Sequence, residues 1–198
     1  MSDWSEAGLK RIYLAGPEVF LPNALEIGRA KVAMAQDAGF EGLFPLDQQL
    51  ALEGLPKVEQ ARRISLANEA LMRSADLLIA NLTPFRGVSM DSGTAFEVGF
   101  MRALGRPVLG YSNVPGDYRR RAEAFRARGV PPGDCDAPGV EIEDFGLAEN
   151  LMIAIAILES GGTVVEGSAP PEAAPEAAMG DLTAFRQSLD EARRLVGV

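Results

Sequence analysis

Two carboxylates, Asp91 and Glu97, lie on either side of the start of a helical pattern and have side chains suited to catalysis. The unpaired N–H groups at a helix start favour negative charge, so an ionised Glu97 is stabilised there. An ionised, positioned glutamate can act as a nucleophile. The stretch from Thr94 to Glu97 also fits a capping box, in which both side chains only satisfy backbone donors, and this is the commoner arrangement. Spacing alone leaves both interpretations open.

The segments around these carboxylates predict a β-α-β unit. Leu77 to Leu82 is an apolar run of the length that a strand buried on both faces needs, and the next strand starts at Pro107. Gly105 ends the intervening helix in the left-handed conformation that glycine favours. Three apolar residues recur at helical spacing within that helix: Phe96, Phe100 and Leu104. The unit predicts a parallel sheet whose carboxyl edge, where open α/β sheets bind ligands, carries the loop after the first strand.

An earlier strand, Lys10 to Ala15, carries Tyr13 toward its carboxyl end and precedes a helix from about Ala24 to Ala38. A tyrosine there is either an edge aromatic with its hydroxyl in water or part of a site. The loop between strand and helix, Gly16 to Phe20, is acidic and has no basic residue, which disfavours a phosphate ligand. We therefore expect a ligand without a phosphate group.

A second strand is predicted over Phe40 to Leu46, broken by Pro45, and places Asp47 at the same edge of the sheet. A turn-forming aspartate accounts equally well for that residue. The polar and basic section from Leu55 to Ala67 continues into Asn68 to Asp76, a helix that precedes the central strand.

Composition excludes several classes of function. The 198 residues carry a net charge of −9 with a pI near 4.6, which argues against nucleic-acid or membrane-surface partners. The chain has no histidine, which removes histidine-dependent triads and His-ligated zinc. Cys135 is the single cysteine, and neither a leader-like apolar region nor a membrane-length apolar run occurs, so we expect a cytoplasmic protein.

Four segments together resemble one enzyme family. They are YLAGPEVF from Tyr13, NEALMRSADLLIANLTPF from Asn68, DSGTAFEVGFMRALGRPV from Asp91, and ENLMI from Glu149. In this order they are similar to the nucleoside 2-deoxyribosyltransferase family, over roughly residues 11 to 158. The resemblance implies a doubly wound, flavodoxin- or Rossmann-like parallel sheet with flanking helices, in agreement with the β-α-β pattern.

The resemblance also implies roles for single residues. Glu97 matches the glutamate that attacks C1′ of a 2′-deoxynucleoside and forms a covalent deoxyribosyl-enzyme. Asp91 matches the acid/base toward the nucleobase, although an N-cap is the alternative from position alone. Tyr13 matches a tyrosine whose hydroxyl neighbours the catalytic glutamate. The substrate-binding residues expected by the same match are Gly16, Pro17, Phe20, Asp47, Asn68, Gly93 and Asn150.

Asn68 departs from part of the family, in which an aspartate at this position serves the leaving base. An amide donates and accepts hydrogen bonds but cannot act as a general acid. Either Asp91 alone handles the proton of the base, or Asn68 only orients the base. Asn150 matches an asparagine that, in the family, forms part of the active site of a neighbouring subunit. This match implies at least a homodimer.

The expected organisation is an α/β domain over 10–160, a flexible linker rich in Gly, Pro, Ala and Glu over 161–180, and an amphipathic C-terminal helix over 181–198. The expected reaction is transfer of 2-deoxyribose between nucleobases, with no metal or organic cofactor. Two alternatives remain open: an N-glycosidase in which water resolves the intermediate, and a nucleoside- or nucleotide-binding module whose acidic residues are structural.

Overall fold

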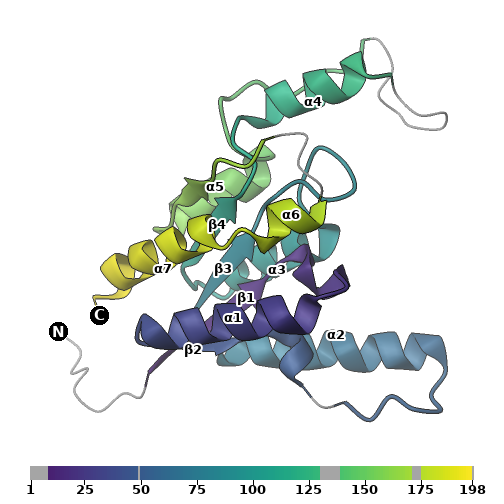
Figure 1. The fold of residues 1–198 in the computed structure, drawn as a ribbon, viewed down its shortest axis with the longest axis vertical. Helices are drawn as coiled ribbons and strands as arrows, with labels where there is room; N and C mark the ends of the chain where they lie inside the picture. Colours follow the sequence, from purple (N-terminus) through teal and green to yellow (C-terminus); the bar gives the residue numbers. More distant parts are fainter. Residues whose placement is uncertain (1–8, 49, 130–138, 171–174, 198) are drawn as a thin grey trace.

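The computed structural model describes residues 9–48, 50–129, 139–170 and 175–197, which form a parallel sheet between two layers of helices (Figure 1). The strands are β1 (Lys10–Ala15), β2 (Phe40–Leu43), β3 (Leu77–Asn81), β4 (Val108–Ser112) and β5 (Val164–Glu166). The α-helices are α1 (Ala24–Asp37), α2 (Lys57–Ser74), α3 (Ser92–Ala103), α4 (Tyr118–Ala127), α5 (Leu151–Glu159), α6 (Pro175–Gly180) and α7 (Thr183–Val196). Two 3-10 turns, η1 (Pro17–Phe20) and η2 (Pro45–Asp47), follow β1 and β2.

Five strands form the sheet in the order β2-β1-β3-β4-β5, and every pair is parallel. The predicted doubly wound α/β fold is therefore confirmed. The order reverses at β1, since the chain goes from β1 to one side for β2 and to the other side for β3. Open α/β sheets bind ligands at such a switch point, outside the carboxyl ends of the strands. That place lies beyond Ala15 and Asn81.

Alternate residues of β1 face two separate cores, as the two-residue period of a strand requires. Ile12 and Leu14 pack with α1 and α7 on one face of the sheet. Tyr13 and Ala15 pack with α2, α3 and α5 on the other face. Figure 1 shows α1 and α7 lying across the same side of the strands. Both faces of the central strands are thus covered, which explains why β3 is apolar up to its last residue, Asn81, and buried at every position.

β2 ends at Leu43, earlier than the sequence indicated, because Pro45 opens η2 and cannot donate to a neighbouring strand. The range 161–180, which composition indicates to be a linker, contains β5 and α6. Gly162 shows why glycine is found there: a Cβ on it would lie 1.8 Å from the carbonyl oxygen of Val108. Close approach to β4, rather than freedom of the backbone, accounts for this glycine. No helix in the described part of the chain is long and apolar enough to cross a bilayer.

Candidate active site

The hydroxyl of Tyr13 meets the carboxyl group of Glu97. Tyr13 extends from the middle of β1 into the core under α3, where it is fully buried. Its hydroxyl donates a 2.5 Å hydrogen bond to Oε1 of Glu97, which lies on the second turn of α3 and is half-buried. Of the two interpretations of Tyr13, the edge aromatic in water is therefore wrong. The bond joins a strand and a helix that are 84 residues apart in the chain.

Electrostatics set this carboxyl group apart from an ordinary surface glutamate. Burial raises the pKa of Glu97 to about 7, the hydrogen bond from Tyr13 opposes the rise, and the nearby carboxylates of Asp91 and Glu18 add to it. Burial and the neighbouring Glu97 raise the pKa of Tyr13 far above its usual value. Tyr13 therefore keeps its proton and acts as donor, while Glu97 changes charge near neutral pH.

Asp91 caps α3. Its Oδ2 accepts from the backbone N–H groups of Gly93 at 2.9 Å and Thr94 at 3.3 Å, while its backbone is extended. Thr94 does not form the capping box considered above, since its buried hydroxyl oxygen has no hydrogen-bond partner in the described structure. Asp91 takes that structural role, and Glu97 turns toward Tyr13 instead. Gly93 lets the cap close, because a Cβ there would lie 2.8 Å from the Asp91 oxygen.

The loop after β1 is built on a buried ion pair that sequence reasoning missed. Glu18 is fully buried, and its Oε1 accepts from Lys31 Nζ at 2.8 Å, Asn81 Nδ2 at 3.0 Å and Tyr111 Oη at 2.9 Å. Burial alone would raise the pKa of Glu18, but Lys31 and the hydrogen bonds lower it. The loop is thus acidic in sequence, yet this charge is neutralised inside the protein. The sequence contains an indication of this pair. Lys31 lies four residues from both Ile27 and Ala35, which are buried, so helical spacing places it on the buried face of α1.

Gly16 and Pro17, two predicted substrate-binding residues, are buried beside this pair. A Cβ on Gly16 would lie 1.9 Å from Oε2 of Glu18, so glycine is required for Glu18 to fold under the loop. The loop backbone therefore passes over the carboxyl end of β1 without an intervening side chain.

Phe20 lies at the end of the loop with 55% of its surface exposed. Its ring stacks on Phe85, with centroids 5.6 Å apart and planes 14° from parallel. The guanidinium of Arg86 lies 4.7 Å from the centroid of Phe85 and 5.2 Å from that of Phe20. Arg86 is exposed but held over two rings, and its backbone is in the left-handed conformation. Together the three side chains form an aromatic platform next to the loop.

The elements that carry two further predicted residues, Asp47 and Asn68, are joined by the amide of Gln48. Asp47 ends η2 and is exposed, and Asn68 is half-buried on α2. Gln48 links the two elements, since its Nε2 donates to Oδ1 of Asn68 at 3.4 Å. An amide pair can present both donors and acceptors to a planar ligand.

Asn150 caps α5 within its own chain. Its Oδ1 accepts from Met152 N, and its Nδ2 donates to Oε1 of Glu143 at 2.7 Å. The other oxygen of Glu143 accepts from Leu151 N. The side chain of Asn150 is therefore already engaged at the start of α5.

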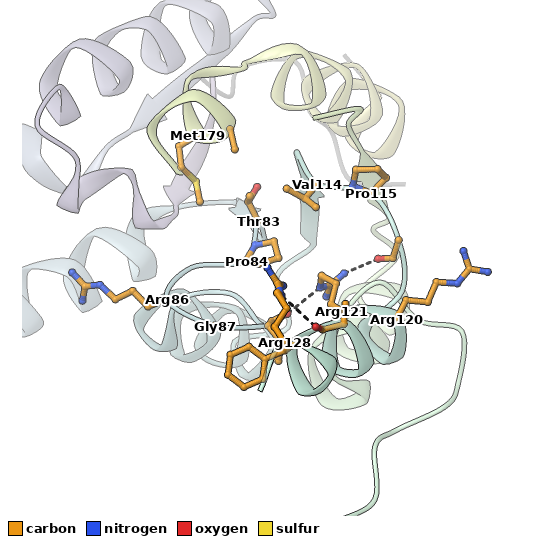
Figure 2. Close-up of a pocket in the computed structure, with 15 residues that line it drawn as sticks. Thr83, Pro84, Arg86, Gly87, Val114, Pro115, Arg120, Arg121, Arg128 and Met179 are labelled. Carbon is orange, nitrogen blue, oxygen red and sulfur yellow. Dashed lines mark hydrogen bonds between the residues drawn. The ribbon is translucent and has the colours of Figure 1, made fainter. Parts of the chain in front are cut away.

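A cavity of about 670 Å³ lies next to the candidate active site and does not include its central residues. The lining comes from residues 83–84, 86–88, 114–116 and 178–179, together with one side of α4. Figure 2 shows Arg86 and Arg120 extending away from its centre. Tyr13, Asp91 and Glu97 do not line it.

The combination of a buried tyrosine, a perturbed glutamate and a capping aspartate at the switch point agrees with the comparison to known proteins. The sequence model described as nucleoside 2-deoxyribosyltransferase matches residues 12–152. The chain belongs to this family.

Among relatives of this deoxyribosyltransferase-family chain, an uncharacterized protein of Schizosaccharomyces pombe is 35% identical over 167 residues, which is 77% of this chain and 79% of the relative. The solved structure of a 2-desoxiribosyltransferase from Leishmania mexicana is similar with 32% identity and a TM-score of 0.54, over 73% of this chain and 85% of the other. A conserved protein from Enterococcus faecalis V583 shares the fold, with 19% identity, a TM-score of 0.56, and coverage of 93% and 99%.

Membership in the nucleoside 2-deoxyribosyltransferase family makes this protein an enzyme that acts on the glycosidic bond of nucleosides, with nucleosides and bases as substrates. The segments noted in the sequence fall within the matched range, apart from the last residue of ENLMI.

Proposed function

We propose that the protein transfers 2-deoxyribose from one nucleobase to another by double displacement, with Glu97 as the nucleophile. The observation that carries this proposal is the 2.5 Å bond by which Tyr13 fixes the Glu97 carboxyl group at the switch point of the sheet. Nucleoside and base substrates follow from the family, whereas the covalent intermediate is the part that needs a test.

In the first displacement, a carboxylate oxygen of Glu97 forms a bond to C1′ while the C1′–N bond breaks. The electron pair of that bond goes to the departing base, which takes up a proton from Asp91. The transition state has oxocarbenium character, as in retaining glycosidases. Asp91 caps α3 through Oδ2 only, so we assign the proton transfer to Oδ1. Tyr13 holds Glu97 in place and keeps its own proton.

In the second displacement, a nitrogen of the incoming base attacks C1′ and the ester bond to Glu97 breaks. The incoming base loses its proton to Asp91, and the Glu97 carboxylate is restored. If water attacks in place of a base, the same site is an N-deoxyribosidase. The two outcomes share every residue named here and differ only in the acceptor.

We assign substrate contacts to the residues that surround this pair. The backbone over Gly16 and Pro17 faces the sugar, and Gly93 belongs to the same edge. Phe20 offers a ring face on which a base can stack. A separate group would contact base edges: Asp47, Gln48 and Asn68. The bond from Gln48 orients the amide of Asn68, which favours an orienting role over proton transfer for Asn68.

We infer that a second copy of the chain completes the site. Helices α3 and α5 contact one another and leave large apolar side chains exposed. These are Phe96 on α3, Leu104 at the C-cap of α3, and Met152, Ile155 and Leu158 on α5. An apolar surface of this kind is typical of an interface. Asn150 stands at the beginning of α5, so a copy docked there would meet it.

The experiment is an exchange assay with deoxyinosine plus adenine, and separately thymidine plus adenine, with all bases followed by chromatography. Transfer predicts deoxyadenosine from the wild type and none from Glu97→Ala. Release of hypoxanthine or thymine without deoxyadenosine would identify the hydrolase. Binding without consumption of either donor, and no covalent adduct on Glu97 by mass spectrometry, would favour the binding module.

A further inference from the structure

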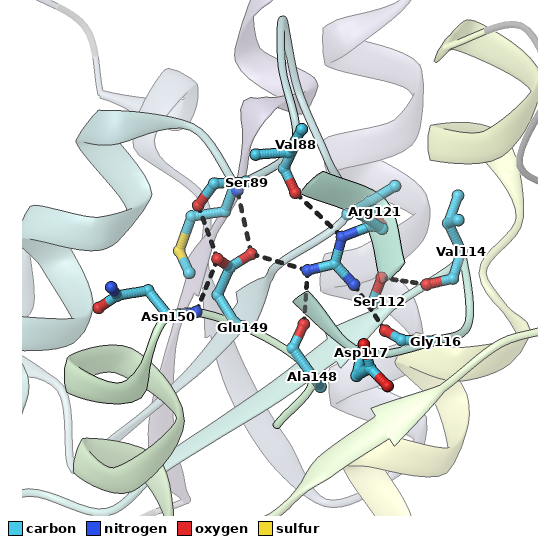
Figure 3. Close-up of polar contacts among 12 residues, drawn as sticks. Val88, Ser89, Ser112, Val114, Gly116, Asp117, Arg121, Ala148, Glu149 and Asn150 are labelled. Carbon is cyan, nitrogen blue, oxygen red and sulfur yellow. Dashed lines mark hydrogen bonds and ion pairs between the residues drawn. The ribbon is translucent and has the colours of Figure 1, made fainter. Parts of the chain in front are cut away.

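One buried ion pair holds the loop that leads to Asp91. Oε2 of Glu149, just before α5, lies 3.4 Å from Nη2 of Arg121 on α4. The Glu149 side chain is fully buried, and that of Arg121 is 12% exposed. Figure 3 shows both side chains pointing toward one another between the loop after β3 and the start of α5.

The pair bonds three consecutive residues of that loop. Oε1 of Glu149 accepts from Ser89 Oγ at 2.7 Å, and Oε2 accepts from Met90 N at 3.3 Å. Nε of Arg121 donates to the carbonyl oxygen of Val88 at 2.9 Å. The next residue is Asp91, so the chain is fixed immediately before the proposed acid/base.

The remaining bonds of the pair reach two other segments. Arg121 donates from Nη1 to the Gly116 carbonyl and from Nη2 to the Ala148 carbonyl, both at 2.6 Å. Glu149 Oε1 also accepts from Asn150 N at 2.8 Å. Arg121 thus uses its planar fork for three carbonyl oxygens and a carboxylate. A lysine has one nitrogen and cannot reproduce that geometry.

Stability alone is a poor explanation for such a pair, since burying two charges costs about as much as their attraction returns. Its bonds instead converge on the residues before Asp91, while the cap of α3 fixes the residues after it. We propose that Glu149 and Arg121 are positioning residues that set the place of Asp91 relative to the departing base; this rests on the function proposed above. We assign neither residue a contact with the substrate.

The test compares Arg121→Lys and Ser89→Ala with Arg119→Lys, a matched control. Arg119 lies on the same helix, and within the described ranges its ion pairs are with exposed Glu123 and Asp144. A displaced catalytic group costs up to about 100-fold in rate. We expect kcat for deoxyinosine to fall about 10- to 100-fold in Arg121→Lys and less in Ser89→Ala, which loses one bond, with KM within about threefold. Arg119→Lys should match the wild type.

A second donor separates positioning from general damage. The base of 7-methyl-2′-deoxyguanosine leaves without taking up a proton, so its transfer does not need Asp91 as an acid. Arg121→Lys should therefore slow this donor far less than deoxyinosine. Equal losses with both donors, or unchanged kcat in both Arg121→Lys and Ser89→Ala, would overturn the proposal.

Amide hydrogen exchange gives a readout that does not depend on the reaction. Residues 88–94 should exchange faster in Arg121→Lys than in Arg119→Lys and the wild type, while the β1 amides keep their protection. Unchanged exchange in 88–94 would overturn the positioning role even if transfer is intact. If the wild type shows no transfer, the proposed function fails, and this measurement still decides whether the pair holds the loop.

Discussion

Tyr13 donates its hydroxyl proton to Glu97 across the interface of a central strand and the helix above it, and the two oxygen atoms are 2.5 Å apart. The strand is hydrogen-bonded on both sides and is buried from Ile12 to Ala15, so Tyr13 has little freedom to move. A residue on α3 is thereby fixed by the sheet rather than by a loop. Sites on rigid elements hold reacting groups more accurately than sites on loops.

Glu97→Gln is expected to stabilise the protein at pH 8 and to leave its stability unchanged at pH 4. The pKa of Glu97 is raised to about 7 in the folded protein, so the folded state resists ionisation. Neutral Glu97 makes its full contribution to the free energy of unfolding below the pKa of the unfolded state, about 4.3. This contribution is lost as the pH rises to about 7. The gain at pH 8 should be on the order of 1–3 kcal/mol, measured by urea unfolding at both pH values. Equal effects at the two pH values would contradict the shifted pKa.

Tyr13→Phe is expected to lower kcat/KM and to move its acidic limb to higher pH. The hydrogen bond from Tyr13 lowers the pKa of Glu97, so its loss raises that pKa further. In the wild type, kcat/KM should fall as the pH drops below about 7, because the nucleophile becomes protonated. A pH profile of both proteins checks this, and a limb that stays in place or moves to lower pH would argue against the assignment.

Asp91→Asn separates the two roles of Asp91. Asparagine caps helices about as well as aspartate, so the thermal stability should stay close to that of the wild type. The amide cannot transfer the proton, so kcat for deoxyinosine should fall about 10²- to 10⁴-fold. Asp117→Asn, at the cap of α4, is the matched control and should leave activity intact. Full activity in Asp91→Asn would assign Asp91 to capping alone.

Lys31→Met is expected to destabilise the protein by about 3–5 kcal/mol, because it leaves Glu18 charged and unpaired in the interior. Lys57→Met, at the exposed start of α2, is the control and should change stability by less than about 0.5 kcal/mol. Chemical unfolding of both variants at pH 7 measures the difference. A small effect in Lys31→Met would mean that Glu18 takes up a proton or finds another donor.

The central β-α-β unit could be predicted because its signals are local. The apolar run of β3, the helical spacing within α3 and Gly105 are all short-range patterns, and Gly105 has the left-handed conformation expected of it. The pairing of Tyr13 with Glu97 could not be derived from such patterns, since it depends on which strand lies under α3. The resemblance to the family supplied that relationship, and the structure shows the bond.

Other features were missed for different physical reasons. β5 has only three residues and follows a glycine-rich segment, so the composition of this region indicates a linker rather than a strand. Glu149 stands in a short motif whose recognised residue is Asn150, and three of the four donors to its carboxylate come from segments far away in the chain. The pair of Glu18 and Lys31 had a local signal in the apolar face of α1, but a charged residue on such a face is easily taken for an exposed one.

Helix α7 packs on the same core as β1, because Phe185 and Leu189 join Ile12 and Leu14 in one cluster. This core therefore draws on segments that are synthesised at very different times. While α7 is still inside the ribosome, the face of the sheet beside α1 lacks part of its cover. Nascent chains in this condition expose apolar surface and are prone to aggregate. Between synthesis of β4 and release of α7, the chain therefore presents an apolar face of the kind that chaperones shield.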